Sequence, residues 1–264
     1  MKLICLMKFV PDVDAFTLDG ETGVMVREGL RLVMNPDDVC AVAFALRVKA
    51  THPETSVEVV TMAPVTVTPH MEDLIRVGVD KGTILADPAF AGSDTYATAT
   101  VLARHLARCD FDVILTGTHA IDGDTAHVPA QLGACLALSQ MSGIVRVDEN
   151  RFTHESAVFD VESEDEVATY AMVLPGILSL TRDSGYKLPY PSRKALERDV
   201  SSQLQIVSNR ELAFAEGQVG LGGSRTQVVK AFARKNTHKD QIVVQADDEG
   251  IAFIHQYLRD KGFL

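Results

Sequence analysis

Residues 115–129 read LTGTHAIDGDTAHVP, and this stretch leads from a strand through a loop into a helix. The apolar run 112–116 predicts the strand, and helical spacing predicts the helix from about 126 to 138. Backbone N–H groups at such a helix start, together with the Thr125 hydroxyl, are suited to hold a phosphate. The alternative is a capped helix that binds nothing, with Asp124 or Thr125 as its N-cap. The stretch by itself leaves both interpretations open.

Apolar runs and helical segments alternate through the first three quarters of the chain. The predicted strands are residues 3–7, 57–62, 83–86 and 112–116. Four helices are predicted between and after them. The first is capped by Asp38 and ends near Thr51, and the others are residues 71–77, the segment from after Ser93 to about Arg108, and residues 126–138. Continuous apolar strands joined by helices are typical of a parallel sheet covered on both faces. Because such connections are right-handed, we expect an α/β fold with a doubly wound, mostly parallel Rossmann-like sheet.

The pattern changes after about Gly143. We predict antiparallel strands at residues 144–147, 151–159 and 167–172, with an acidic turn at 162–165. These strands would add to the sheet, and a last strand is predicted at residues 177–181. Residues 186–198 predict an extended, exposed segment, residues 209–247 have little core periodicity, and residues 249–261 predict a helix. A C-terminal segment with so few apolar groups would hardly fold alone. We therefore predict a nucleotide-binding α/β domain at 1–190 and an extended C-terminal arm and helix at 191–264.

Composition and charge exclude several classes of protein. The 264 residues are 46% hydrophobic and 23% charged, which is ordinary for a globular protein with a sizeable core. The net charge of −11 argues against nucleic acid as a ligand, because phosphate backbones bind clustered Lys and Arg. No run approaches the roughly 20 apolar residues of a membrane helix, and the N-terminal apolar stretch is too short for a signal peptide. We expect a cytoplasmic protein, or one in an equivalent reducing compartment.

The side chains that hold metals or act as nucleophiles form no familiar motif. Cys5, Cys40, Cys109 and Cys135 lie far apart in apolar runs, where free cysteine usually behaves as a small buried hydrophobe. The histidines lack metal-ligand spacing, and two aspartates in the 122–124 loop are a weak metal signal. The GLGG stretch at 220–223 lacks the strand that precedes a dinucleotide fingerprint, so it predicts a flexible tail segment. We predict neither a metal site nor a catalytic residue.

Three more loops follow strands or precede helices in the way that the 117–125 loop does. They are residues 8–12, residues 34–38 and residues 62–64. The Asn-Pro-Asp-Asp of the second loop, taken alone, is a turn and cap signal. On a parallel sheet all four loops fall along one edge, where a nucleotide could lie.

These segments resemble the electron-transfer flavoprotein beta subunit. Residues 8–12, KFVPD, are similar to that family's Lys-x-Val-Pro-Asp, and residues 35–38 with 41–49 are similar to its Asn-Pro-x-Asp and the helix that follows. The AIDGDTA loop at 120–126 is the most specific match. Further matches are residues 78–81, 94–98, 222–230 and 261–262. The resemblance covers essentially the whole chain.

The resemblance implies an adenine-nucleotide-binding fold and a heterodimer with an alpha subunit that carries FAD, on which the C-terminal arm and helix would pack. It also implies a second nucleotide on the beta subunit: AMP in respiratory members, or a second FAD that accepts hydride from NADH in electron-bifurcating members. Residues 122–129, DGDTAHVP, and residues 22–29 are similar to the bifurcating group, so FAD is favoured and AMP is the alternative. The implied partners are the alpha subunit, an acyl-CoA dehydrogenase-type redox partner, and ferredoxin or flavodoxin, with NAD(H) as a candidate electron donor.

The resemblance also implies the nucleotide's contacts. The implied cofactor-binding residues are Leu6, Lys8, Asn35, Asp38, Met62, Thr95, Gly117, His119, Ala120, Ile121, Asp122, Gly123, Asp124, Thr125, Ala126, His127, Val128 and Pro129.

The chain departs from the family pattern in two places. Thr118 and His119 stand where the family has Lys or Arg and then Gln, and His127 replaces another Gln. Losing a cation weakens the charge balance of a bound phosphate, and the two histidines would make binding pH-sensitive. The family's partner-recognition loop corresponds to residues 184–192, of which only the last three match clearly.

Three rival hypotheses remain. Each would share the α/β sheet. They are an AMP-binding structural subunit, a stress-type nucleotide-binding module that forms a homodimer, and an assembly subunit with an empty site.

Overall fold

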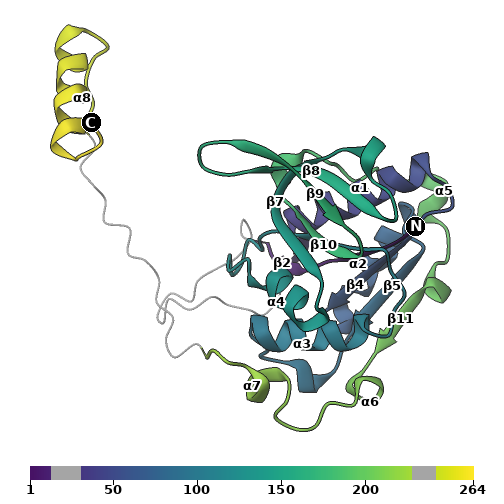
Figure 1. The fold of residues 1–264 in the computed structure, drawn as a ribbon. Helices are drawn as coiled ribbons and strands as arrows, with labels where there is room; N and C mark the ends of the chain where they lie inside the picture. The colour runs from purple at the N-terminus through teal and green to yellow at the C-terminus, as the bar shows by residue number, and fades with distance from the viewer. Residues whose placement is uncertain (13–30, 228–241) are drawn as a thin grey trace. The chain divides into compact units, whose positions relative to one another are not determined.

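The computed structural model describes residues 1–12, 31–227 and 242–264, so the similar segment at 22–29 lies outside the described residues. The chain divides into two compact units, Met1–Val229 and Lys230–Leu264. The first holds the sheet and its covering helices, and the second holds α8 (Figure 1).

A nine-stranded sheet forms the centre of the first unit. Its strands in spatial order are β11 (Leu204–Val207), β5 (Lys81–Leu85), β4 (Ser56–Met62), β1 (Lys2–Leu6), β6 (Val113–Gly117), β10 (Gly176–Leu180), β7 (Ser139–Val147), β8 (Ser156–Glu162) and β9 (Val167–Val173). Neighbouring strands are parallel from β11 to β7, whereas β8 and β9 continue antiparallel. β2 (Phe9–Pro11) and β3 (Leu32–Met34) form a separate antiparallel pair.

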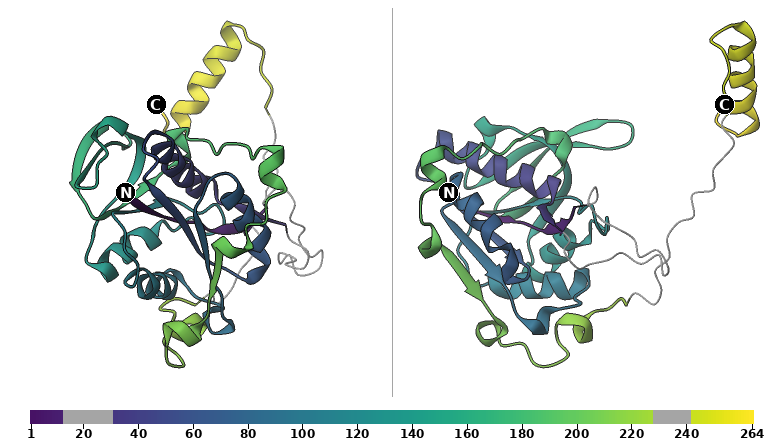
Figure 2. Two further views of the ribbon diagram at one scale, coloured as in Figure 1. Left: turned by 90° about the vertical axis from the view of Figure 1, so that its right-hand side faces the viewer. Right: turned by 180° about the vertical axis from the view of Figure 1, so that it is seen from behind.

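Helices cover both faces of this sheet (Figure 2). They are α1 (Pro36–Thr51) and α2 (Thr68–Arg76) on one face, and α3 (Thr95–Leu106) and α4 (His127–Leu136) on the other. Alternate residues of a strand point to opposite faces, so Leu3 and Cys5 of β1 pack under α1 and α2, while Ile4 and Leu6 pack under α3 and α4. The doubly wound, mostly parallel sheet predicted from the alternation is therefore confirmed.

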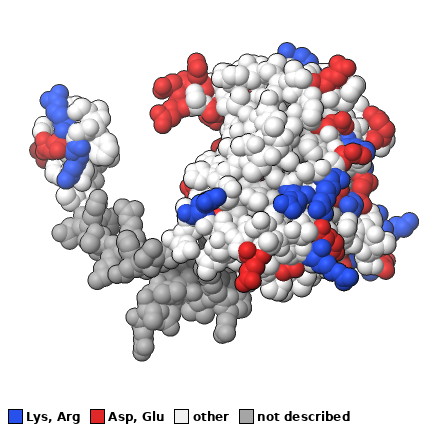
Figure 3. All heavy atoms as spheres, turned by 60° about the horizontal axis from the view of Figure 1, so that its bottom comes forward, with Lys and Arg blue, Asp and Glu red and all other residues white. Residues whose placement is uncertain are grey.

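Several predicted boundaries were wrong in informative ways. β7 begins at Ser139 rather than 144, because its first half pairs in parallel with β10 before its second half pairs with β8. The strand predicted from 151 begins only at Ser156, after a one-turn 3-10 helix at Glu149–Arg151. The β8–β9 turn is acidic as expected, and Figure 3 shows its carboxylates gathered at the hairpin tip.

Residues 191–227 of the predicted arm belong to the first unit. β11 adds the outermost strand beside β5, and the short helices α5 (Arg193–Leu196), α6 (Asn209–Leu212) and α7 (Gly220–Gly223) surround it in sequence. GLGG is therefore one helical turn rather than a flexible loop. Within the segment predicted to be exposed, Tyr190 is 98% exposed, but the Tyr186 ring packs 5.2 Å from that of Phe44. Packing of the arm on an alpha subunit stays a prediction.

The second unit contains α8 (Asp248–Asp260), within one residue of the predicted helix. None of the described helices is long and apolar enough to cross a membrane.

All four cysteines are free. Cys5 and Cys40 are buried, and burial raises the pKa of both thiols, but Cys135 is exposed, so the expectation of burial was wrong there. Within residues 1–12, 31–227 and 242–264, no cluster of His, Cys, Asp and Glu is arranged to hold a metal.

Candidate functional site

A cavity of about 460 Å³ opens at the carboxyl ends of β1, β4 and β6. The start of α3, the 117–126 loop and the start of α4 complete its wall. All the residues predicted to bind a nucleotide line this cavity except Ile121, Asp122 and Asp124. The shared edge inferred from the sequence is therefore a real cavity, while the role of its residues as ligands stays a prediction.

Sequence reasoning missed part of the wall. The missed lining residues are Met7, Val60, Phe90, Gly92, Ser93, Asp94, Thr98, Leu102, Thr116 and Thr118. Phe90 to Asp94 form the loop after β5, and the rule that placed the other loops at this edge applies equally to this one. Leu102 and Thr98 lie on the α3 face above the sheet, which helical spacing from Thr95 could have indicated.

One end of the cavity is apolar. Leu6, Val60, Met62, Phe90 and Leu102 supply its wall, and all but Met62 are buried in the cores. A flat heterocyclic base would bury its rings against such a surface. The opposite end is formed by the 117–126 loop and α4 and offers backbone groups instead.

The first turn of α1 clamps this polar end. Asp38 was predicted to cap α1, but the helix starts at Pro36, so that prediction was wrong. The Asp38 carboxylate instead accepts hydrogen bonds from the backbone N–H groups of Lys8 (2.9 Å) and Gly117 (2.7 Å). These residues follow β1 and end β6. The buried carboxylate thus joins the ends of two adjacent strands beneath the cavity.

Asp37 and Asn35 extend the same clamp. Asp37 accepts hydrogen bonds from the backbone N–H groups of His119 and Arg182, each at 3.0 Å. The Asn35 side chain donates to the carbonyl of His119 at 2.6 Å and accepts from the N–H of Ile121 at 3.2 Å. Asn-Pro-Asp-Asp is therefore not only a turn and cap, because its side chains also hold the 117–126 loop in place.

Burial dominates the titration of Asp38. It raises the pKa of this carboxyl to about 7, although the N–H donors of Lys8 and Gly117 and the Asn35 side chain act to lower it; Asp37 raises it further. The loss of hydration outweighs two good hydrogen bonds, as expected for a carboxylate with almost no solvent contact.

The start of α4 decides between a capped helix and an anion site. Ala126 occupies the N-cap position with φ of 51°, and no side chain caps the helix. Neither Asp124 nor Thr125 does so, and Asp124 itself has φ of 48°. Among the described residues, the N–H groups of His127 and Val128 thus have no side-chain partner at the positive end of the helix dipole, and both residues line the cavity. This arrangement fits a phosphate.

The two loop carboxylates do not oppose an anion here. Asp122 accepts from the Lys8 ammonium at 2.6 Å, and Asp124 lies 2.9 Å from Nδ1 of His119. Both carboxylates lie off the cavity wall, and their partners are a cationic and a titratable side chain.

Thr118 stands where the family has a cation, and its hydroxyl is used within the fold. Its hydroxyl donates to the Ser179 carbonyl of β10 at 3.0 Å and accepts from the N–H of Gly143 at 3.1 Å. Threonine here ties the loop to β10 and β7. Among the described residues that line the cavity, Lys8, just after β1, is the one Lys or Arg.

Comparison with known proteins identifies the family. The model of the electron transfer flavoprotein domain matches residues 22–175. A subunit of the caffeyl-CoA reductase–Etf complex of Acetobacterium woodii, CarD, is 30% identical over 88% of both chains. Electron transfer flavoprotein subunit beta of Thermoanaerobacterium thermosaccharolyticum is 31% identical over 90% of both. The acryloyl-CoA reductase electron transfer subunit gamma of Anaerotignum propionicum is 26% identical over 88% of both. The chain belongs to the electron transfer flavoprotein family, among its beta subunits.

Proposed function

We propose that this beta subunit forms a heterodimer with an FAD-carrying alpha subunit and holds a second FAD by its adenosine and phosphate groups in the cavity. The uncapped start of α4, facing a cavity whose loop carboxylates are already paired, is the observation that carries this proposal. A structural helix end would use Asp124 or Thr125 as a cap. Here both side chains leave the N–H groups of His127 and Val128 available.

Each part of the wall has a distinct task in this proposal. The α4 N–H groups bind the phosphate oxygens, and Lys8 adds positive charge while it neutralises Asp122. Leu6, Met62 and Phe90 hold the base in the apolar end. Asn35, Asp37 and Asp38 keep the loop in its binding conformation. When bound, the flavin supplies the chemistry that links a hydride donor to one-electron acceptors.

We propose electron transfer between NADH or an acyl-CoA dehydrogenase-type partner and a ferredoxin or flavodoxin, with flavin-based bifurcation as the mode. The DGDTAHVP loop supports bifurcation, and relatives that belong to caffeyl-CoA and acryloyl-CoA reductase systems support a CoA-linked partner. The 184–192 segment is the proposed partner contact, since its Tyr190 side chain is almost wholly solvated.

A count of nucleotides per heterodimer tests the proposal. The chain is co-expressed with a candidate alpha subunit from the same organism, and the released nucleotides are separated and quantified. Two FAD per heterodimer are expected, whereas one FAD and one AMP would refute the second flavin and favour the AMP-binding subunit. A stable homodimer of this chain without flavin would instead favour the stress-type module.

A variant pair tests the location of the site. Thr125→Glu places a carboxylate on the cavity wall at the α4 start, and we expect at least about tenfold weaker binding of the second nucleotide. Ala130→Glu adds the same charge on the exposed side of the same helix, off the cavity wall. Equal nucleotide content in the two purified variants would contradict the assignment.

A further inference from the structure

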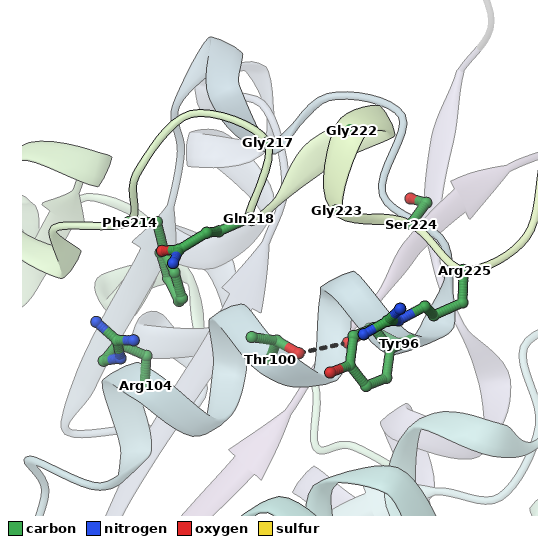
Figure 4. Close-up of a pocket in the computed structure, with 10 residues that line it drawn as sticks. All are labelled: Tyr96, Thr100, Arg104, Phe214, Gly217, Gln218, Gly222, Gly223, Ser224 and Arg225. Carbon is green, nitrogen blue, oxygen red and sulfur yellow. Dashed lines mark hydrogen bonds between the residues drawn. The ribbon is translucent and has the colours of Figure 1, made fainter.

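A second cavity, of about 410 Å³, lies between α3 and the segment 214–225 (Figure 4). We call it the α3 pocket. Tyr96, Thr100 and Arg104 line its floor at four-residue intervals, so they share one face of α3. The segment that carries Phe214, Gln218 and Arg225 passes over them in Figure 4. None of these residues lines the nucleotide cavity.

Two arginines stand at opposite ends of the α3 pocket, and each is stacked on an aromatic ring. The Arg104 guanidinium lies 4.3 Å from the centre of the Phe214 ring, and that of Arg225 lies 5.0 Å from the centre of the Tyr96 ring. Arg104 also donates to the Leu212 carbonyl at 3.1 Å. Ring stacking restricts both guanidinium planes while leaving N–H donors for a ligand.

No carboxylate neutralises either guanidinium among the residues that the structure describes. Asp94 contacts the same segment, and its oxygens accept from the N–H groups of Ala97, Arg225 and Thr226 and from the Thr226 hydroxyl. The Asp94 carboxylate is therefore held by the backbone and is not part of the pocket wall. In a chain of net charge −11, a pocket with two unpaired guanidinium groups is unusual.

The remaining polar groups of the wall favour a ligand that only accepts hydrogen bonds. The Gln218 side-chain oxygen already accepts from the N–H of Ala215 at 2.9 Å, which leaves its amide N–H₂ for a ligand. The Thr100 hydroxyl donates to the Tyr96 carbonyl, and the Ser224 hydroxyl donates to the Gly220 carbonyl and accepts from the N–H of Asp94. Donors outnumber free acceptors, which is the chemistry of an anion site.

We propose that the α3 pocket binds a small molecule that carries two phosphate groups, one at Arg104 and one at Arg225. Along α3, Tyr96 and Arg104 are separated by eight residues, or about 12 Å at a rise of 1.5 Å per residue. Because Arg225 is stacked on Tyr96, the two guanidinium groups are too far apart to share one phosphate. A single phosphate would engage one arginine, whereas a bisphosphate engages both.

Calorimetric titration of the flavin-loaded heterodimer tests this assignment. The probes are a hexose bisphosphate, inorganic phosphate and the neutral hexose. We expect the bisphosphate to bind on the order of tenfold or more tightly than phosphate, the neutral hexose not to bind, and the affinity to fall as salt is raised. Arg104→Gln or Arg225→Gln should bring the bisphosphate down to the affinity of phosphate. Arg210→Gln, which removes the same charge from α6 outside the pocket wall, should leave it unchanged.

Two outcomes would overturn the proposal. One is a bisphosphate affinity equal to that of phosphate, and the other is equal binding by the Arg225→Gln and Arg210→Gln variants. Arg225 makes no side-chain hydrogen bond in the described chain, so its variant tests the pocket without removing a structural contact of Arg104. Thr125→Glu keeps this test separate from the nucleotide proposal: bisphosphate binding should survive that change, and its loss would assign the probe to the nucleotide cavity instead.

Discussion

The buried carboxyl of Asp38 makes a quantitative prediction about stability and pH. Its pKa is about 7 in the folded chain, against an ordinary value of 3.8. A folded pKa above the unfolded one means that the folded state holds the proton more tightly. The resulting stability is fully present below pH 3.8 and is lost as the pH rises through 7.

The size of the effect follows from the same two pKa values. At about 1.36 kcal/mol per pH unit, the full loss is roughly 4 kcal/mol, of which roughly 2 to 3 kcal/mol falls between pH 5 and 8. In Asp38→Asn the position cannot ionise, but its amide N–H₂ faces the N–H of either Lys8 or Gly117. We expect that mismatch to cost about 1 to 3 kcal/mol at every pH.

Urea unfolding of the heterodimer at fixed protein and flavin concentrations, from pH 5 to 8, measures both effects. The unfolding free energy of the natural chain minus that of Asp38→Asn should fall by roughly 2 to 3 kcal/mol over this range, so that the variant becomes the more stable chain at pH 8. Asp110→Asn, at an exposed residue, controls for the altered net charge. A gap that stays constant from pH 5 to 8 would refute the reasoning, because Asp38 would then be ionised throughout. An infrared band of a protonated carboxyl at pH 5.5, absent from Asp38→Asn, would confirm it directly.

Two further predictions concern the same edge of the sheet. A Cβ at Gly117 would lie 2.5 Å from Oδ1 of Asp38, so Gly117→Ala should lower the melting temperature markedly. Gly123→Ala is the control and should not lower it, because no atom lies within 4 Å of its Cβ. Similar losses in both variants would contradict the role of Asp38 in holding the strand ends together. Lys8→Met should weaken nucleotide binding by about tenfold because it leaves Asp122 unpaired, and adding Asp122→Asn should restore most of the affinity measured by fluorescence titration. A double variant no better than Lys8→Met alone would show that Lys8 does not act through Asp122.

The strands were predictable where burial alone decides them. β1, β4, β5 and β6 lie within one or two residues of their predicted bounds, because each is an apolar run buried on both faces. β11 escaped prediction because its four residues, LQIV, are half exposed at the sheet edge and carry little pattern. Its strand structure depends on pairing with β5, which lies more than a hundred residues earlier in the chain.

The edge of the sheet that carries the cavity was predictable from loop positions, but the pairing of its polar groups was not. Parallel strands bring the ends of β1, β4 and β6 together, so loops recognised separately in the sequence had to meet. The sequence by itself therefore determined the doubly wound sheet, the edge that carries the cavity and most of the cavity's residues. The sheet and its edge follow from which residues are apolar and at what spacing, whereas the individual cavity residues follow from the resemblance to the family.

Only the tertiary structure decided how the polar groups pair. Asp38 bonds to residues 30 and 79 positions away, and Asp37 bonds to residues 82 and 145 positions away. The same is true of the Lys8–Asp122 pair, which removes the apparent conflict between loop carboxylates and a phosphate. Periodicity records burial because burial repeats with the local geometry of helix and strand. A hydrogen bond between distant segments leaves no such trace, so the uncapped start of α4 and the neutralised loop became visible only once the chain was folded.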